Sequence, residues 1–282
     1  MRIEGPGSSN VEDRRGMSFG RGGLIGGGIG TVVLVVLGLM FGVDPRVLLS
    51  VAEVAQPPAV EQPGKVGEPT DEMGRFVSVV LRETTGTWTT VFRQLGQSYP
   101  EPRVVLFEGA TPTACGTGQS AMGPFYCPLD ERIYLDLVFY RQLHERFKAP
   151  GDFAQAYVIA HEVGHHVQNR LGILKQMETA RQRLPQAQLN QLQVRLELQA
   201  DCFAGVWARH ADQRKLLEPG DVEEAMRAAA AIGDDTIQRR TQGRIVPDSF
   251  THGTSAQRTQ WFMTGMRSGN IEACNTFERD RV

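Results

Sequence analysis

The sequence lacks a strong charge of either sign and contains few cysteines and histidines. Its 30 basic and 32 acidic residues leave a formal net charge of -2, so it has no sign of the basic surface that nucleic-acid-binding proteins carry. Only four cysteines occur, and no two of them form the C-x-x-C pair typical of structural zinc sites. We also find no internal repeat. These absences exclude a nucleic-acid partner and a cysteine-rich zinc module.

The chain does contain one long stretch without charge. Residues 22–43 carry no charged side chain and include TVVLVVLGLMF. About 22 residues at about 1.5 Å each reach about 33 Å, which is enough to cross a bilayer, so we predict one transmembrane helix. Four arginines in residues 1–21 predict a cytoplasmic N-terminal tail and an extracytoplasmic domain. The alternative is a cleaved signal peptide ending near residues 50–52 (SVA), but the apolar stretch ends well before that point.

The rest of the chain divides into a linker and one domain. Residues 44–71 are rich in proline and poor in aromatic residues, which predicts a linker. Residues 72–282 are long enough to bury a sizeable core. Periodicity predicts helices at 71–95, 152–172, 186–211 and 221–240, and short strands at 103–107, 123–127 and 132–135. We therefore expect an α+β domain, mainly helical with a small sheet, in which residues 133–135 form an edge strand for an extended peptide.

The stretch HEVGHHVQ contains the pattern H-E-x-x-H as His161, Glu162 and His165. Residues four apart lie on one face of a helix, so the two imidazoles can hold one metal ion. Zinc is the expected ion, because it favours such donors in a tetrahedron and leaves one position to water in catalytic sites. Glu162 lies about 100° round from His161, beside that water, where it can act as the general base.

The alternative is a polar helix face that carries two unrelated histidines. Chance alone produces the pattern in about one such chain in a hundred. The residues before His161 are mostly apolar, which indicates a buried helix. His166, the extra histidine, points away from the pair, so we expect it to make a structural hydrogen bond or to lie near the surface.

A third ligand is needed from elsewhere in the chain. The metzincin pattern would place a histidine at position 171, but that residue is Leu171. Downstream, LELQADCFAG contains Glu197 and Asp201, four apart on one helical face. We assign Glu197 to the metal and Asp201 to a hydrogen bond with His161. Such pairs are common on solvated faces, but this one lies among apolar residues, where uncompensated carboxylates would be costly.

Three further residues are candidates for the reaction. His252 lies in a polar loop before an apparent helix, where it could hydrogen-bond the oxyanion that forms at the peptide carbonyl, or could simply make a loop contact. Tyr157, one turn before the metal helix's first histidine, is a lesser candidate for the same role. Arg258 could pair with a structural acid such as Asp248 or Glu272.

The four cysteines support the outward position of the domain. An even number outside the cytoplasm suggests two disulfides, with three possible connectivities. Cys115 and Cys127 flank a glycine-rich turn, so we pair them, which leaves Cys202 with Cys274. Free buried thiols are the alternative if the domain faces the cytoplasm.

Taken together, HEVGHHVQ, ELQADCFAG and HGTSAQR resemble the motifs of the bacterial neutral zinc metallopeptidase family, the YpfJ-like peptidases of gluzincin type. The resemblance covers essentially the whole chain. It implies a zincin-like peptidase fold, an outward-facing domain and a membrane anchor, but no particular substrate. By position, it assigns the metal ligands to His161, His165 and Glu197, the base to Glu162, and supporting roles to Asp201, His252 and Arg258.

The sequence therefore predicts a membrane-anchored zinc endopeptidase that hydrolyses peptide bonds through a zinc-bound water activated by Glu162, with His252 steadying the oxyanion. Its partner would be a peptide or protein substrate, and the sequence gives no oligomeric state. The alternative is a catalytically inactive or latent zinc-binding module that acts as a binding or chaperone-like protein at the cell envelope. Glu162 argues against it, because a purely structural metal site needs no base.

Overall fold

The structure is a computed structural model that describes residues 1–3, 5–17 and 63–278. The predicted transmembrane helix at 22–43, the alternative signal-peptide site and most of the predicted linker lie outside these ranges. Within them, none of the helices has the length and apolar character needed to span a bilayer.

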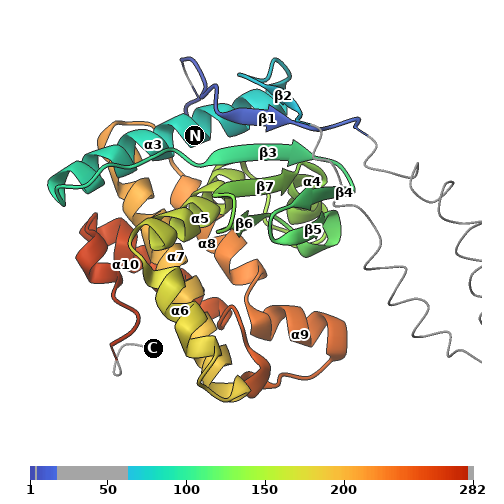
Figure 1. Ribbon diagram of the computed structural model, residues 1–282, viewed down its shortest axis with the longest axis vertical. Helices are drawn as coiled ribbons and strands as arrows, with labels where there is room; N and C mark the ends of the chain where they lie inside the picture. The colour runs from blue at the N-terminus through green and yellow to red at the C-terminus, as the bar shows by residue number, and fades with distance from the viewer. Residues whose placement is uncertain (4, 18–62, 279–282) are drawn as a thin grey trace, which may run out of the picture.

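One layer of the molecule is a five-stranded sheet with strand order β2-β1-β3-β7-β6 (Figure 1). Its strands are β1 (Val11–Asp13), β2 (Lys65–Val66), β3 (Arg103–Phe107), β6 (Phe125–Cys127) and β7 (Arg132–Asp136). Strands β1, β3 and β7 are parallel, whereas β2 and β6 run antiparallel to their neighbours. A separate hairpin consists of β4 (Ala110–Thr113) and β5 (Gly116–Gln119).

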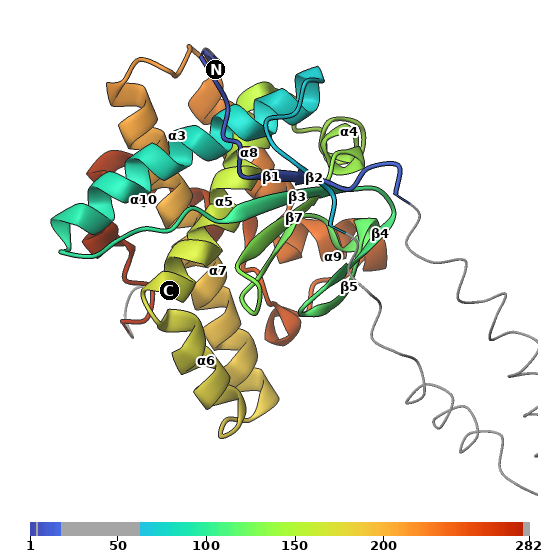
Figure 2. The ribbon, with the colours of Figure 1, turned by 45° about the horizontal axis from the view of Figure 1, so that its top comes forward.

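Helices form the rest of the molecule around α5 (Figures 1 and 2). They are α3 (Glu72–Gln94), α4 (Val138–Glu145), α5 (Asp152–Arg170), α6 (Ile173–Arg181), α7 (Gln186–Gln213), α8 (Asp221–Ala231), α9 (Asp234–Gln242) and α10 (Ser255–Ser268). Helix α5 packs against α3, α7 and α8, and α7 packs along α10. Val104 and Leu106 of β3 face this helical core, while Val105 and Phe107 face the other side of the sheet, as the period of a strand requires.

Most predicted elements are confirmed to within a few residues, including the helix at 71–95 and the strands at 103–107 and 132–135. Residues 133–135, however, do not form an edge strand. They lie in β7, which pairs with β3 on one side and β6 on the other, so β6 is the edge of the sheet at this end.

The single helix expected at 221–240 is in fact two helices, α8 and α9, which meet at Gly233. Here the chain passes close to the start of α10, because a Cβ atom on Gly233 would lie 2.4 Å from the backbone nitrogen of Ser255. A contact between segments this far apart in sequence is invisible to helical periodicity. The break matters because it directs Asp234, the first residue of α9, towards the loop that carries His252.

The N-terminal residues belong to the domain, which corrects our division of the chain. Strand β1 lies between β2 and β3 in the main sheet. The Met1 ammonium group lies 2.9 Å from Asp152 and 3.2 Å from both Glu218 and Asp221, and the Met1 side chain is buried. The folded unit therefore starts well before residue 72. Because β1 pairs with β3, residues 11–13 and the domain form one sheet in this conformation.

Both expected disulfides are present. Cys115–Cys127 links the β4–β5 turn to β6, and Cys202–Cys274 links α7 to a short 3-10 helix, η3 (Ile271–Cys274). Near the second disulfide, α7 and α10 touch backbone to backbone, because Cβ atoms on Gly205 and Gly265 would lie 2.0 Å and 1.9 Å from carbonyl oxygens of the opposite helix. This close approach fixes α10 against the half of α7 that faces α5.

Candidate metal centre

Two helices supply the predicted ligands. Helix α5 is buried along most of its length, and α7 is buried from Leu196 to Ala208. Gly164 lets them approach, since a Cβ atom there would already lie 3.0 Å from the carbonyl oxygen of Ala200. The i, i+4 spacing of His161 and His165 then presents both rings to α7, as the sequence predicts.

The donor atoms of His161, His165 and Glu197 converge on one point. Oε2 of Glu197 lies 3.2 Å from Nε2 of His161 and 3.5 Å from Nε2 of His165. Two ligands that each lie about 2.0 to 2.1 Å from a tetrahedral zinc ion are about 3.3 Å apart. The two distances from Glu197 therefore match edges of a zinc tetrahedron, and the three donor atoms all lie within 4.8 Å of one another.

Each histidine is held by a partner on its other ring nitrogen. Nδ1 of His161 donates to Asp201 at 2.9 Å, and Nδ1 of His165 donates to Oε1 of Gln168 at 2.8 Å. The amide of Gln168 is oriented because its Nε2 donates to the carbonyl of Leu196. Both imidazoles thus carry their proton on Nδ1, which leaves the Nε2 lone pairs for a metal.

The charges of the site also suit a cation. Burial raises the pKa of Glu197, but the neighbouring charges of His165 and His161 outweigh this and hold it well below its usual range. Burial lowers the pKa of His161, yet Asp201 and Glu197 together raise it to about 10. Without a metal, a proton on His161 balances the negative charge of Glu197. A bound zinc ion would supply that positive charge in place of the proton.

Arg258 neutralises the buried Asp201. Its Nε and Nη2 donate to the two carboxylate oxygens at 2.8 and 2.9 Å, and Tyr157 donates its hydroxyl to the same group. Burial raises the pKa of Asp201, but Arg258 and His161 bring it down to about 2. Arg258 thus pairs with Asp201 rather than with Asp248 or Glu272, and the hydroxyl of Tyr157 is occupied by this network rather than free for the oxyanion.

Glu162 lies beside the metal site with its carboxylate uncommitted. It is only 7% exposed, and burial raises its pKa even though His165 and His161 act in the opposite direction. Across the described parts of the chain, no donor hydrogen-bonds this carboxylate. A buried carboxylate with a raised pKa and no fixed partner is suited to accept and return a proton.

His252 is positioned by Asp234, a residue that our sequence analysis missed. Oδ2 of Asp234 accepts the backbone N–H groups of Thr251, His252 and Gly253 at 2.6 to 3.0 Å, and Oδ1 lies 3.3 Å from Nδ1 of His252. Asp234 and then the nearby Glu197 raise the pKa of His252, although burial lowers it. The only signal in the sequence was an aspartate pair after a glycine, which usually marks just a helix start.

Two glutamines were also missed. Gln168 holds His165, and Gln193 donates to Oε1 of Glu197 at 2.9 Å. Gln168 follows His165 by three residues in α5, and Gln193 precedes Glu197 by four residues in α7. Each glutamine therefore lies on the same helical face as its ligand. His166 behaves as expected, because Nε2 bonds the carbonyl of Pro100 and Nδ1 bonds Tyr126, away from the metal ligands.

A helix with two histidines and an adjacent base, completed by a glutamate from a second helix, defines the donor set of a zinc peptidase. Comparison with known proteins agrees. The chain belongs to the family described as "Putative neutral zinc metallopeptidase", whose model matches residues 1–277.

Two relatives illustrate its range. The chain is 49% identical to the uncharacterised protein YpfJ of Escherichia coli K12 over 284 residues, covering 96% of each chain. It is 42% identical to the uncharacterised protein Rv2575 of Mycobacterium tuberculosis H37Rv over 217 residues, covering 73% of this chain and 72% of that one. No solved structure matches the chain.

Proposed function

We propose that this protein is a zinc-dependent endopeptidase in which Glu162 is the general base. The observation that carries the proposal is that Glu197 lies 3.2 Å from His161 and 3.5 Å from His165, beside the buried carboxylate of Glu162, which accepts no hydrogen bond from the described residues. A purely structural metal site would have no use for that carboxylate.

The chain's own residues divide the remaining work. When bound, zinc polarises the scissile carbonyl and makes water more acidic. Glu162 removes a proton from the attacking water and delivers it to the leaving nitrogen. His252, half exposed and held by Asp234, donates a hydrogen bond to the oxygen on which negative charge develops. Asp201 and Gln168 keep the two ligand histidines in the required orientation.

Strand β6 is the best-placed element to bind an extended substrate. It is one of the two edge strands of the main sheet, and an edge strand can take up a peptide through backbone hydrogen bonds. Its central residue, Tyr126, contacts His166 at 3.0 Å, directly after the ligand His165. A peptide paired with β6 would therefore run past the metal helix. A cleft of about 410 Å³, lined in part by Val194 and Phe250, offers room for a substrate side chain.

The test separates an enzyme from a zinc-binding module. Wild type and Glu162→Gln are purified in parallel, their zinc content is measured, and cleavage of casein is followed. We expect equal zinc in both proteins and a loss of at least a hundredfold in cleavage by Glu162→Gln. Zinc-loaded wild type that cleaves nothing, or a Glu162→Gln variant with unchanged activity, would contradict the proposal.

We also propose that the domain works outside the cytoplasm and that residues 22–43 attach it to the membrane. The two disulfides support an oxidising compartment. Because β1 and β2 both join the same sheet, the segments on either side of this stretch would lie on one side of the membrane.

A further inference from the structure

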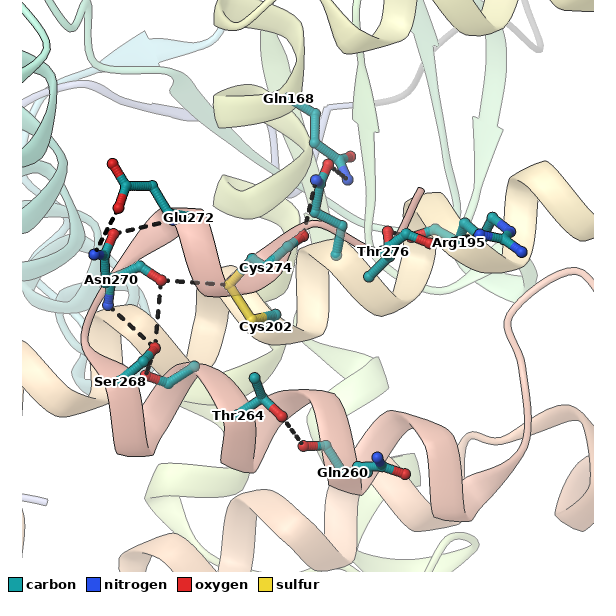
Figure 3. Close-up of a disulfide and its surroundings, with 12 residues drawn as sticks. Gln168, Arg195, Cys202, Gln260, Thr264, Ser268, Asn270, Glu272, Cys274 and Thr276 are labelled. Atoms are coloured by element: carbon teal, nitrogen blue, oxygen red, sulfur yellow. Dashed lines mark hydrogen bonds between the residues drawn. A yellow bond between two sulfur atoms is a disulfide. The ribbon is translucent and has the colours of Figure 1, made fainter. Parts of the chain in front are cut away.

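A chain of amide hydrogen bonds leads from the Cys202–Cys274 disulfide to the metal site. The carbonyl oxygen of Cys274 accepts from Nε2 of Gln199 at 3.0 Å. Oε1 of Gln199 accepts from Nε2 of Gln168 at 3.1 Å, and Oε1 of Gln168 accepts from His165 at 2.8 Å. Figure 3 shows Gln168 above the Cys202–Cys274 disulfide, and Thr276 of the C-terminal segment (residues 271–278) beside Arg195.

Two backbone carbonyl groups, those of Cys274 and Leu196, fix which end of each glutamine amide donates and which accepts. Gln168 and Cys274 are fully buried and Gln199 is 6% exposed, so water does not readily replace a lost partner. If the amide of Gln199 turned over, its NH2 group would face the NH2 group of Gln168. The carbonyl of Cys274 prevents this, because it accepts from the NH2 group of Gln199. The carbonyl of Leu196 likewise accepts from the NH2 group of Gln168 and keeps that amide from turning over. The result is an oxygen facing His165.

The two ligand histidines are thus oriented by different means. His161 depends on the charged pair of Asp201 and Arg258, both held between α7 and α10. His165 depends on neutral amides that end at a segment fastened by a disulfide. The other disulfide, Cys115–Cys127, joins the β4–β5 turn to β6 and belongs to neither arrangement.

We infer that Gln168 and Gln199 are positioning residues for His165 and that the Cys202–Cys274 disulfide sustains zinc affinity through them. This rests on the proposed metal site. The disulfide holds the carbonyl of Cys274 against Gln199, which acts together with the carbonyl of Leu196 to keep the Gln168 oxygen towards Nδ1 of His165. The C-terminal segment has a second attachment, because Thr276 and Arg195 exchange side-chain to carbonyl hydrogen bonds. The segment therefore stays docked when the disulfide is absent, and only the fine position of the Cys274 carbonyl changes.

The experiment measures zinc affinity rather than activity. Full-length wild type, Gln199→Leu and Cys202→Ala/Cys274→Ala compete for zinc with a fluorescent chelator, and Cys115→Ala/Cys127→Ala is the matched control. Loss of a group that orients a ligand histidine costs about 10- to 100-fold in metal affinity. We expect the zinc dissociation constants of Gln199→Leu and of Cys202→Ala/Cys274→Ala to be about tenfold higher than that of wild type. The control should stay within about twofold of wild type.

Combining the changes tests the connection itself. If the disulfide acts through Gln199, adding Cys202→Ala/Cys274→Ala to Gln199→Leu raises the dissociation constant no further. The inference would be overturned if the two changes raised the dissociation constant by factors that multiply. It would also be overturned if Gln199→Leu and Cys202→Ala/Cys274→Ala each bound zinc with wild-type affinity. A disulfide that only stabilises the fold would lower the unfolding temperature without this coupling. Failure of wild type to bind zinc is a different result, because it refutes the proposed function itself.

Discussion

Replacing Arg258 by methionine should expose how strongly the site depends on one buried charge. Asp201 is fully buried, and Arg258 gives it two hydrogen bonds at 2.8 and 2.9 Å. Arg258→Met would remove both of these hydrogen bonds and leave the carboxylate with only His161 and Tyr157 as its donors. Breaking one side of a buried ion pair costs about 3 to 5 kcal/mol. For a domain of this size, about 2 to 4 °C is lost per kcal/mol, so the unfolding temperature should fall by about 6 to 20 °C.

The assay is calorimetry of the metal-free protein with both disulfides intact. Arg214→Met is the matched control, because Arg214 pairs with Glu83 at 2.8 Å but is 40% exposed, where such a pair contributes at most about 1 kcal/mol. Arg258→Met should therefore be clearly the less stable of the two variants. If both lose the same amount, Arg258 is not the counter-charge that keeps Asp201 ionised, and our account of the network is refuted.

Three other predictions concern catalysis, pH and topology. His252→Ala should lower kcat by about 10² to 10³ with zinc content and KM nearly unchanged, as steady-state peptide hydrolysis would reveal; an unaltered kcat would remove His252 from the reaction. Because the folded-state pKa of Asp201 is about 2 and its ordinary value is 3.8, its stabilising contribution of about 2 kcal/mol is complete above about pH 4 and is lost as pH falls towards 2. Denaturant unfolding of the metal-free protein should show this slope, and Asp201→Asn should flatten it; equal slopes would refute the assignment. Cysteines placed at the exposed Ser9 and Lys175 should react with an impermeant maleimide from the same side of the membrane, and labelling from opposite sides would exclude the sheet that contains β1 in the cell.

The sequence was most informative where local periodicity and ligand chemistry coincide. The apolar stretch before His161 predicted α5, and the two i, i+4 pairs predicted which side chains meet. Glu197 is 36 residues from His161, yet its place followed from the cost of burying carboxylates among apolar neighbours. The disulfide pairing was predicted from the glycine-rich stretch between Cys115 and Cys127, which in the structure contains strand β5 rather than a single turn.

What escaped prediction depends on contacts between distant segments. Strand β1 has only three residues, too few to show alternation, and its partners in the sheet lie far along the chain. The break at Gly233 arises from a contact with Ser255, not from the local pattern. Gln168 looks like any polar residue on a helix, because the carbonyl of Leu196, which orients its amide towards His165, belongs to α7 and is brought close only by the fold.

The most direct test of the central claim is a crystal structure of the zinc-loaded protein with anomalous diffraction recorded at the zinc edge. We expect one zinc ion bonded to Nε2 of His161, Nε2 of His165 and a carboxylate oxygen of Glu197, at about 2.0 to 2.2 Å. Zinc bound elsewhere, such as at the acidic group around Asp152 and Asp221, or no bound zinc at all, would contradict the account.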